Sequence, residues 1–188
     1  ETGDTYTITV ITNNRLYVKQ GAIPAEKSLI FKEGDVTLFG ADMTGVEGSQ
    51  KWMLVRDAST LAEGDIVTIA AKSNNYVLGC NSAANFPYAS YETNILKVGD
   101  YLYHPYYTDK SKYQYMVQPL TLAKQDATKA MFSFYNGVDY EGDAKVGYLS
   151  NAQTDNYLKL AEYPSKNSSF AISIEDGVAT IEATDSEW

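Results

Sequence analysis

Short runs of alternating apolar and polar residues, each no longer than a β-strand, restrict the fold of this chain more than any other feature of its sequence. β-Branched and aromatic residues fill these runs, and Gly, Asn, Asp or Pro interrupts them about every ten residues. Such runs are too short for the repeating apolar stripe of an amphipathic helix. The pattern predicts an all-β fold, with strands at residues 6–11, 29–31, 36–39 and 51–55.

The clearest local prediction is a hairpin near the end of the sequence. Residues 170–174 and residues 178–181 are two apolar runs that flank Asp176 and Gly177. This dipeptide tolerates the positive φ angles that a tight hairpin turn requires. We therefore expect the two runs to pair directly.

Two segments have the composition of helix formers, residues 59–63 and residues 122–129. Neither continues beyond two turns before its pattern breaks, and helices this short are marginal. We predict turns or short 3₁₀ pieces at both places.

A polar turn that leads into an apolar strand occurs three times, at residues 12–18, 73–79 and 154–160. Recurrence of a turn–strand unit suggests pseudo-symmetric hairpins, as in trefoil-like barrels, whereas convergence of common turn residues is the other interpretation. We expect a single compact β-barrel or trefoil-like domain of short antiparallel strands, with a β-sandwich as the alternative.

Length and charge limit the classes of protein to which the chain can belong. A chain of 188 residues can bury a core without disulfides, and we predict one domain over residues 4–188. Residues 1–3 resemble the remnant of a mammalian secretion vector, so we exclude them from the fold and expect a secreted protein.

The formal net charge of −9, with scattered lysines, argues against a nucleic-acid groove. Apolar runs are too short for membrane insertion.

The sequence offers few groups for catalysis or metal binding. It has one cysteine, Cys80, and one histidine, His104, which excludes an internal disulfide and a structural zinc site. The neighbours of Cys80 are small and uncharged, so we expect a small buried hydrophobe rather than a nucleophile. We predict no cofactor and no catalytic residue.

Residues 139–143 place three carboxylates at alternate positions, as a calcium loop would. An EF-hand loop requires glycine at its sixth position and glutamate at its twelfth, but Ala144 and Ser150 stand there. An irregular calcium loop and an acidic solvated turn remain as interpretations, and we predict no metal site.

Residues 101–115 contain six tyrosines, an unusual density. Clustered tyrosines provide large rigid contact faces with polar tips, and a hairpin whose rings alternate between core and solvent is the other interpretation. The predicted partner-binding residues are Tyr101, Tyr103, His104, Tyr106, Tyr107, Tyr113 and Tyr115, extended by Tyr88 and Tyr91 of the preceding loop.

Residues 52–71 resemble the opening of an uncharacterised all-β module found in large secreted or cell-surface proteins of gut Bacteroidetes and Firmicutes. Residues 147–160 and 169–181 are similar to the same module in the same order, so the resemblance extends from residue 52 to about residue 183. It implies an extracellular or bacterial cell-surface location and transfers no catalytic motif. Such modules usually continue past the last hairpin, and residues 14–19 followed by residues 28–39 have the order of that tail. We expect residues 4–45 to complete the barrel formed by residues 50–188, or that of a neighbouring module.

These observations favour a non-catalytic, adhesin-like binding module that recognises a host extracellular protein through the Tyr-rich loop. A carbohydrate-binding accessory module of a polysaccharide-degrading enzyme is one alternative, with a tyrosine, Trp52 or Trp188 stacked on sugar rings. An architectural stalk repeat, with its tyrosines buried or packed between modules, is another. A hydrolase would need two carboxylates facing each other in a cleft, or a motif supporting His104 in a triad, and we do not expect an enzyme.

Overall fold

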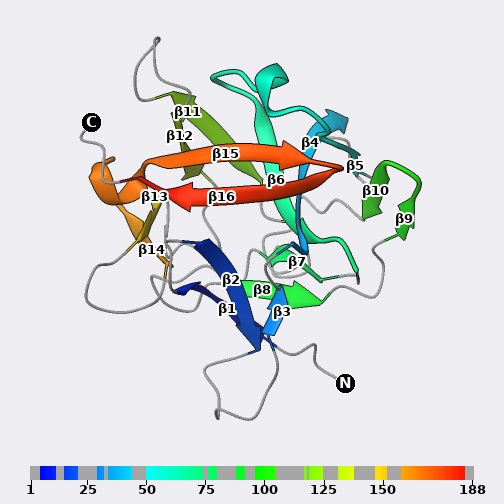
Figure 1. Cartoon of the computed structure of the whole chain (residues 1–188), viewed down its shortest axis with the longest axis horizontal. Helices are drawn as coiled ribbons and strands as arrows, with labels where there is room; N and C mark the ends of the chain where they lie inside the picture. Colours follow the sequence, from blue (N-terminus) through cyan, green and yellow to red (C-terminus); the bar gives the residue numbers. More distant parts are fainter. Residues whose placement is uncertain are drawn as a thin grey trace.

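The fold is a large antiparallel sheet assembly (Figure 1). The computed structural model describes residues 5–11, 15–20, 29–31, 34–43, 50–73, 76–79, 88–91, 96–104, 117, 119–124, 131–137, 147–151 and 158–184. In this part of the chain all the regular structure is strand, apart from two short 3₁₀ helices, so the predicted all-β class is confirmed. No helix in these ranges is long and apolar enough to cross a membrane.

The strands of the first half are β1 (Thr5–Ile11), β2 (Arg15–Gln20), β3 (Leu29–Phe31), β4 (Val36–Met43), β5 (Gln50–Leu54), β6 (Ile66–Ala71), β7 (Tyr76–Gly79) and β8 (Tyr88–Tyr91). Those of the second half are β9 (Leu96–Val98), β10 (Tyr101–His104), β11 (Leu120–Lys124), β12 (Met131–Asn136), β13 (Gly147–Asn151), β14 (Leu158–Ala161), β15 (Phe170–Glu175) and β16 (Val178–Ala183). The 3₁₀ helices are η1 (Ala58–Thr60) and η3 (Lys166–Ser168).

Pairing runs in the order β14-β13-β12-β15-β16-β2-β1-β8-β7-β6-β4-β5-β10-β9, with β3 beside β2. In the described part, β14 and β9 end this path and do not pair with each other. Figure 1 accordingly shows β9 and β10 at one side of the molecule and β13 and β14 at the other. The two ends of the path are thus remote from one another.

The first strands are integral to this assembly. β1 pairs with β2 and β8, and β2 reaches β16 through the pair Arg15–Glu182. β4 pairs with both β5 and β6. Segments from the first 43 residues therefore hydrogen-bond with strands from the middle and the end of the chain.

Two clusters of buried apolar side chains lie on opposite sides of β4 and β6. Because successive side chains of a strand point to opposite faces, Leu38 and Ile69 enter one cluster while Phe39 and Ala70 enter the other. The larger cluster packs against side chains of β11, β12, β13, β15 and β16, and the smaller one contains Trp52 of β5. β6 is buried from Val67 to Ala71, as expected of a strand covered on both faces.

The hairpin predicted near the end of the sequence is confirmed. β15 and β16 pair in register from Phe170–Ala183 to Glu175–Val178. Between them Asp176 and Gly177 have φ angles of 51° and 75°, the left-handed values that the sequence predicts for this turn.

The two segments with helix-forming composition have different outcomes. Residues 58–60 form the 3₁₀ helix η1, which Asp57 caps by accepting a hydrogen bond from the backbone amide of Ser59, so the first prediction is confirmed. The second prediction is wrong for residues 122–124, which belong to β11 between β6 and β12, and its other residues lie outside the described ranges. Tertiary pairing outweighs local helix propensity there, because Leu120 and Leu122 are fully buried in the larger core.

The three recurring turn–strand phrases each lead into a strand, β2, β7 and β14, and most of their turn residues lie outside the described ranges. The predictions for Cys80 and for the acidic residues 139–143 also fall outside these ranges.

Candidate functional site

Among the side chains whose exposure the structure describes, which leaves out those of β1, β2, β3 and β8, five large hydrophobic ones are exposed, and four of these lie on three adjacent strands. They are Met53 of β5, Leu96 and Val98 of β9, and Tyr103 of β10, with exposed fractions of 48%, 58%, 53% and 36%. Together with the half-buried Tyr101 we call them the exposed apolar face. The fifth, Tyr163, lies just beyond β14 at the other end of the sheet path.

Strand register explains why these side chains come together. Val98 lies opposite Tyr101, which in turn lies opposite Met53. In the next row, Leu96 lies opposite Tyr103. Directly opposed residues share a face of the sheet, so the rows form one continuous surface. The rings of Tyr101 and Tyr103 are 6.2 Å apart, centroid to centroid.

In β9 the apolar side chains face solvent and the charged side chain faces the protein interior. Leu96 and Val98 point to solvent, while Lys97 between them points inward and donates a hydrogen bond from Nζ to the carbonyl oxygen of Ala71. Burial lowers the pKa of Lys97 to about 8, and Asp35 acts in the opposite direction. Inward-pointing charges on an edge strand discourage the addition of another strand. β9 is therefore better suited to contact another surface through its outward side chains than to pair with an additional strand.

Lys51 supplies positive charge at the border of the exposed apolar face. Its Nζ lies 4.2 Å from the ring centroid of Tyr101 and 2.7 Å from Oδ2 of Asp42. The hydrogen bond to Asp42 raises the pKa of Lys51. The cation–π contact therefore links Lys51 to the aromatic part of the exposed apolar face.

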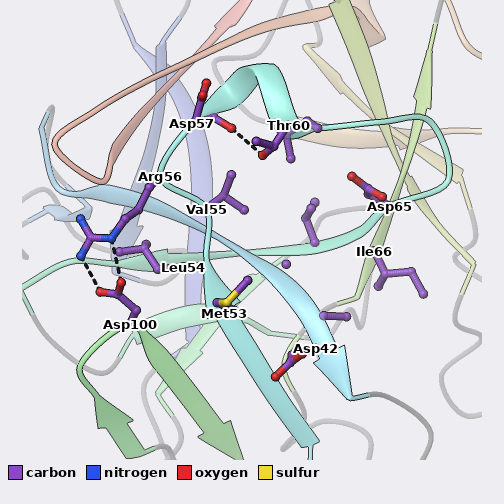
Figure 2. Close-up of a pocket in the computed structure, with 14 residues that line it drawn as sticks. Asp42, Met53, Leu54, Val55, Arg56, Asp57, Thr60, Asp65, Ile66 and Asp100 are labelled. Atoms are coloured by element: carbon purple, nitrogen blue, oxygen red, sulfur yellow. Dashed lines mark hydrogen bonds and ion pairs between the residues drawn. The ribbon is translucent and has the colours of Figure 1, made fainter.

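A groove of about 480 Å³ adjoins this face, and Met53 belongs to both (Figure 2). The end of β4, β5, the segment through η1, the start of β6 and the β9–β10 turn form its walls. The lining residues are Gly40, Ala41, Asp42, Met53, Leu54, Val55, Arg56, Asp57, Thr60, Leu61, Asp65, Ile66, Val67 and Asp100.

Arg56 and Asp100 close one side of the groove, and Asp65 lies on the opposite side (Figure 2). The guanidinium donates two hydrogen bonds to the carboxylate, from Nε at 2.7 Å and from Nη2 at 2.5 Å. This bidentate pairing lowers the pKa of Asp100 and raises that of Arg56. The amide of Leu54 also donates to the carbonyl oxygen of Asp100, so the β9–β10 turn is fixed to the groove wall.

Asp57 and Asp65 hold the loop around η1 in place. Oδ1 of Asp57 accepts a hydrogen bond from the amide of Ser59 at 2.8 Å, and Oδ2 of Asp65 accepts one from the amide of Ala62 at 2.8 Å. The hydrogen bond from Ser59 lowers the pKa of Asp57. Among the side chains that the structure describes, no cation forms an ion pair with either carboxylate.

Two of the four groove carboxylates are held in ion pairs. Asp42 and Asp100 are bound to Lys51 and Arg56, and in the described ranges no three acidic, histidine or cysteine side chains gather as metal ligands would.

The structure brings together part of the predicted site. Tyr101 and Tyr103 point outward from β10 while Leu102 is fully buried, so in these residues the rings do not alternate between core and solvent. His104 is described as part of β10 without its side chain, and Tyr106, Tyr107, Tyr113 and Tyr115 lie outside the described residues. Tyr88 and Tyr91 belong to β8, which β7, β6, β4 and β5 separate from β10 in the sheet.

One proposed sugar platform is excluded. Trp52 has no exposed surface, because its strand alternates outward Lys51 and Met53 with an inward indole ring in the smaller core. Trp188, the other predicted platform, lies outside the described residues. Met53, Leu96, Val98 and the groove were not predicted, since their proximity depends on pairing between segments far apart in the sequence.

Comparison of the chain with models of protein families, with curated proteins and with solved structures finds no match.

Proposed function

We propose that the chain is a non-catalytic binding module that recognises a protein partner through the exposed apolar face. The observation that carries the proposal is the gathering of Met53, Leu96, Val98 and Tyr103 on one face of three strands. Contiguous apolar patches on soluble domains mark interaction surfaces. Tyrosine and methionine are enriched in protein interfaces, which suits the composition of this face.

A protein suits this face better than a glycan does. Sugar-binding sites stack an exposed aromatic ring on each sugar, whereas here aliphatic side chains, Leu96, Val98 and Met53, surround the tyrosines. Aliphatic contacts favour an apolar partner surface, because they offer no hydrogen bonds to hydroxyl groups. The inward position of Lys97 further favours docking on the face over extension of the sheet.

We also propose an adhesin-like role outside the cell, with a host extracellular protein as partner. Its support is the resemblance of residues 52 to about 183 to modules of secreted and cell-surface proteins of gut Bacteroidetes and Firmicutes.

We further propose that the strands close into a barrel-like domain. This proposal is supported by β11, which pairs with both β6 and β12 and so connects two strands that are far apart in the order of pairing.

The experiment is a binding screen of the immobilised protein against human extracellular proteins. The Tyr101→Ala, Tyr103→Ala double variant is run beside Tyr163→Ala, which removes an exposed tyrosine at the other end of the sheet path. We expect a hit that the double variant weakens at least tenfold and that Tyr163→Ala leaves unchanged. Thermal unfolding confirms that both variants are folded.

A glycan array run in parallel separates the alternatives. A glycan hit that depends on Tyr101 and Tyr103 would replace the protein partner with a carbohydrate. Binding that both variants retain would move the site away from the exposed apolar face. Silence of the folded protein in both screens would favour the architectural stalk.

A further inference from the structure

We infer that the groove beside the exposed apolar face receives a basic side chain, arginine or lysine, of the docked protein partner. This inference rests on the proposed function and adds the chemistry of one residue of the partner. It is drawn from the shape of the groove, its apolar floor and the excess of acidic groups around it.

The groove and the exposed apolar face form one continuous surface. Met53 contributes to both, and Asp100 of the groove wall directly precedes Tyr101 of the face. A partner that covers the tyrosines therefore also covers the mouth of the groove. With a volume of about 480 Å³, the groove is larger than one side chain needs, so it admits the group without rearrangement of the sheet.

The floor of the groove is suited to the aliphatic stem of such a side chain. Leu54, Val55, Leu61 and Ile66 line it and are only partly buried, so they retain apolar surface that a ligand can cover. Lysine and arginine bury their methylene groups along apolar surface while the charged end remains with polar partners.

Charge complementarity selects a cation. Four aspartates and one arginine line the groove, and Lys51 at its border pairs with one of the aspartates, so two formal negative charges are in excess. Asp42 and Asp100 are already bound to Lys51 and Arg56. Of the remaining two, Asp65 accepts one backbone hydrogen bond through Oδ2, which leaves Oδ1 for a donor from the partner. Asp57 accepts hydrogen bonds from Ser59 and adds its negative charge to the groove.

An anionic ligand is disfavoured at the same place. Arg56 is the only cation lining the groove in the described residues, and Asp100 already neutralises its charge through hydrogen bonds on the Nε/Nη2 edge. An anion in the groove would therefore lie near Asp57 and Asp65 without a cation of its own. A guanidinium or ammonium group of the partner avoids this repulsion.

The test is an NMR titration of the whole chain with Nα-acetyl-arginine methylamide, which presents the side chain without the rest of a partner. Nα-acetyl-norleucine methylamide, with a similar stem and no charge, is the matched probe. We expect amide shifts in residues 54–67, a dissociation constant of about 1 mM as for other fragments of this size, and weaker binding as salt increases. The norleucine probe should shift these amides far less.

Charge-neutral variants assign the binding to the two groove carboxylates that have no cationic partner among the described side chains. Asp57→Asn and Asp65→Asn keep an oxygen that can accept the hydrogen bonds of Ser59 and Ala62, so the loop is preserved. The double variant should bind the arginine probe about tenfold more weakly. Glu162→Gln, which removes an exposed carboxylate next to β14, should leave the affinity unchanged.

Several results would overturn the inference. These are equal shifts with the norleucine probe, undiminished binding by the double aspartate variant, shifts confined to other segments, or no shifts at all. The proposed function fails separately, through the tyrosine variants and the protein screen. If the Tyr101→Ala, Tyr103→Ala variant no longer captures the partner but the groove does not bind the arginine probe, this inference is overturned and the proposed function is not.

Discussion

The amino group of Lys97 donates a hydrogen bond to the carbonyl oxygen of Ala71, which fastens the terminal strand β9 to the end of β6. Alternation along β9 then fixes the two neighbouring side chains, Leu96 and Val98, in solvent. The inward position of Lys97 therefore explains why the β9 part of the exposed apolar face points to solvent.

The first prediction concerns the pH dependence that this buried lysine imparts. The pKa of Lys97 is about 8 in the folded chain, compared with 10.5 for an unperturbed lysine. Between these values the unfolded chain binds more protons, so the contribution of Lys97 to the free energy of unfolding increases with pH and is complete above 10.5. Because solvent screens the partly exposed amino group, we expect a gain on the order of 1–2 kcal/mol.

Urea unfolding of the wild type and of Lys97→Met from neutral pH to 10.5 measures this gain as the difference between the two curves. The variant should lack the increase, whereas Lys166→Met, at an exposed position of η3, should retain it. Parallel curves for the wild type and Lys97→Met would contradict the prediction.

Gly147→Ala should destabilise the pairing of β13 with β14. A Cβ atom at this position would lie 2.5 Å from the carbonyl oxygen of Ala161, so backbone rather than a flexible side chain must move. We expect a loss of about 1–3 kcal/mol in the free energy of unfolding by denaturant. Gly40→Ala is the control, since its Cβ would meet only ordinary contacts at 3.7 Å and 3.9 Å. Equal stability of the two variants would show that β13 adjusts without strain.

Gly177→Ala should weaken the β15–β16 hairpin. Gly177 has a φ angle of 75°, which costs an L-residue about 1–2 kcal/mol, and its added Cβ would lie 3.2 Å from Cδ2 of Leu54. The melting temperature should fall, and Gly177→Asn should fall less, because asparagine tolerates the left-handed region better than alanine. The reverse order of the two variants would indicate that contact with Leu54 governs the effect.

Replacing Leu96 with Ser and Val98 with Thr should leave stability within about 0.5 kcal/mol of the wild type, since both side chains are more than half exposed. The same double variant should raise solubility and weaken capture of a protein partner. Chemical denaturation and the binding assay, done on one preparation, separate the two effects. A loss of several kcal/mol would mean that the exposed apolar face is part of the folded core.

Local sequence predicted those elements whose geometry is decided within a few residues. The alternating runs became strands, and Asp176 and Gly177 formed the expected turn because their positive φ angles suit the residue types. Residues 122–124 were mispredicted as a turn or 3₁₀ piece, because they favour a helical turn locally while pairing between β6 and β12 decides for a strand.

Only part of the candidate site could be predicted. Tyr101 and Tyr103 stood out through their density in the sequence, whereas Leu96 and Met53 carry no local signal. The alternation of residue types along a strand predicts that successive side chains point to opposite faces of the sheet, but it does not predict which face is exposed to solvent. Sequence patterns also could not exclude Trp52 as a sugar platform, since its burial depends on pairing with β4 and β10.

β6 is buried on both faces and shares its side chains between the two apolar clusters. Neither cluster can come apart while this strand keeps its partners, so the two should melt in one cooperative transition. The backbone amides of Val67 to Ala71 should accordingly exchange their hydrogens more slowly than any others described, at the rate of global opening. A single strand thus makes two hydrophobic cores behave as one folding unit.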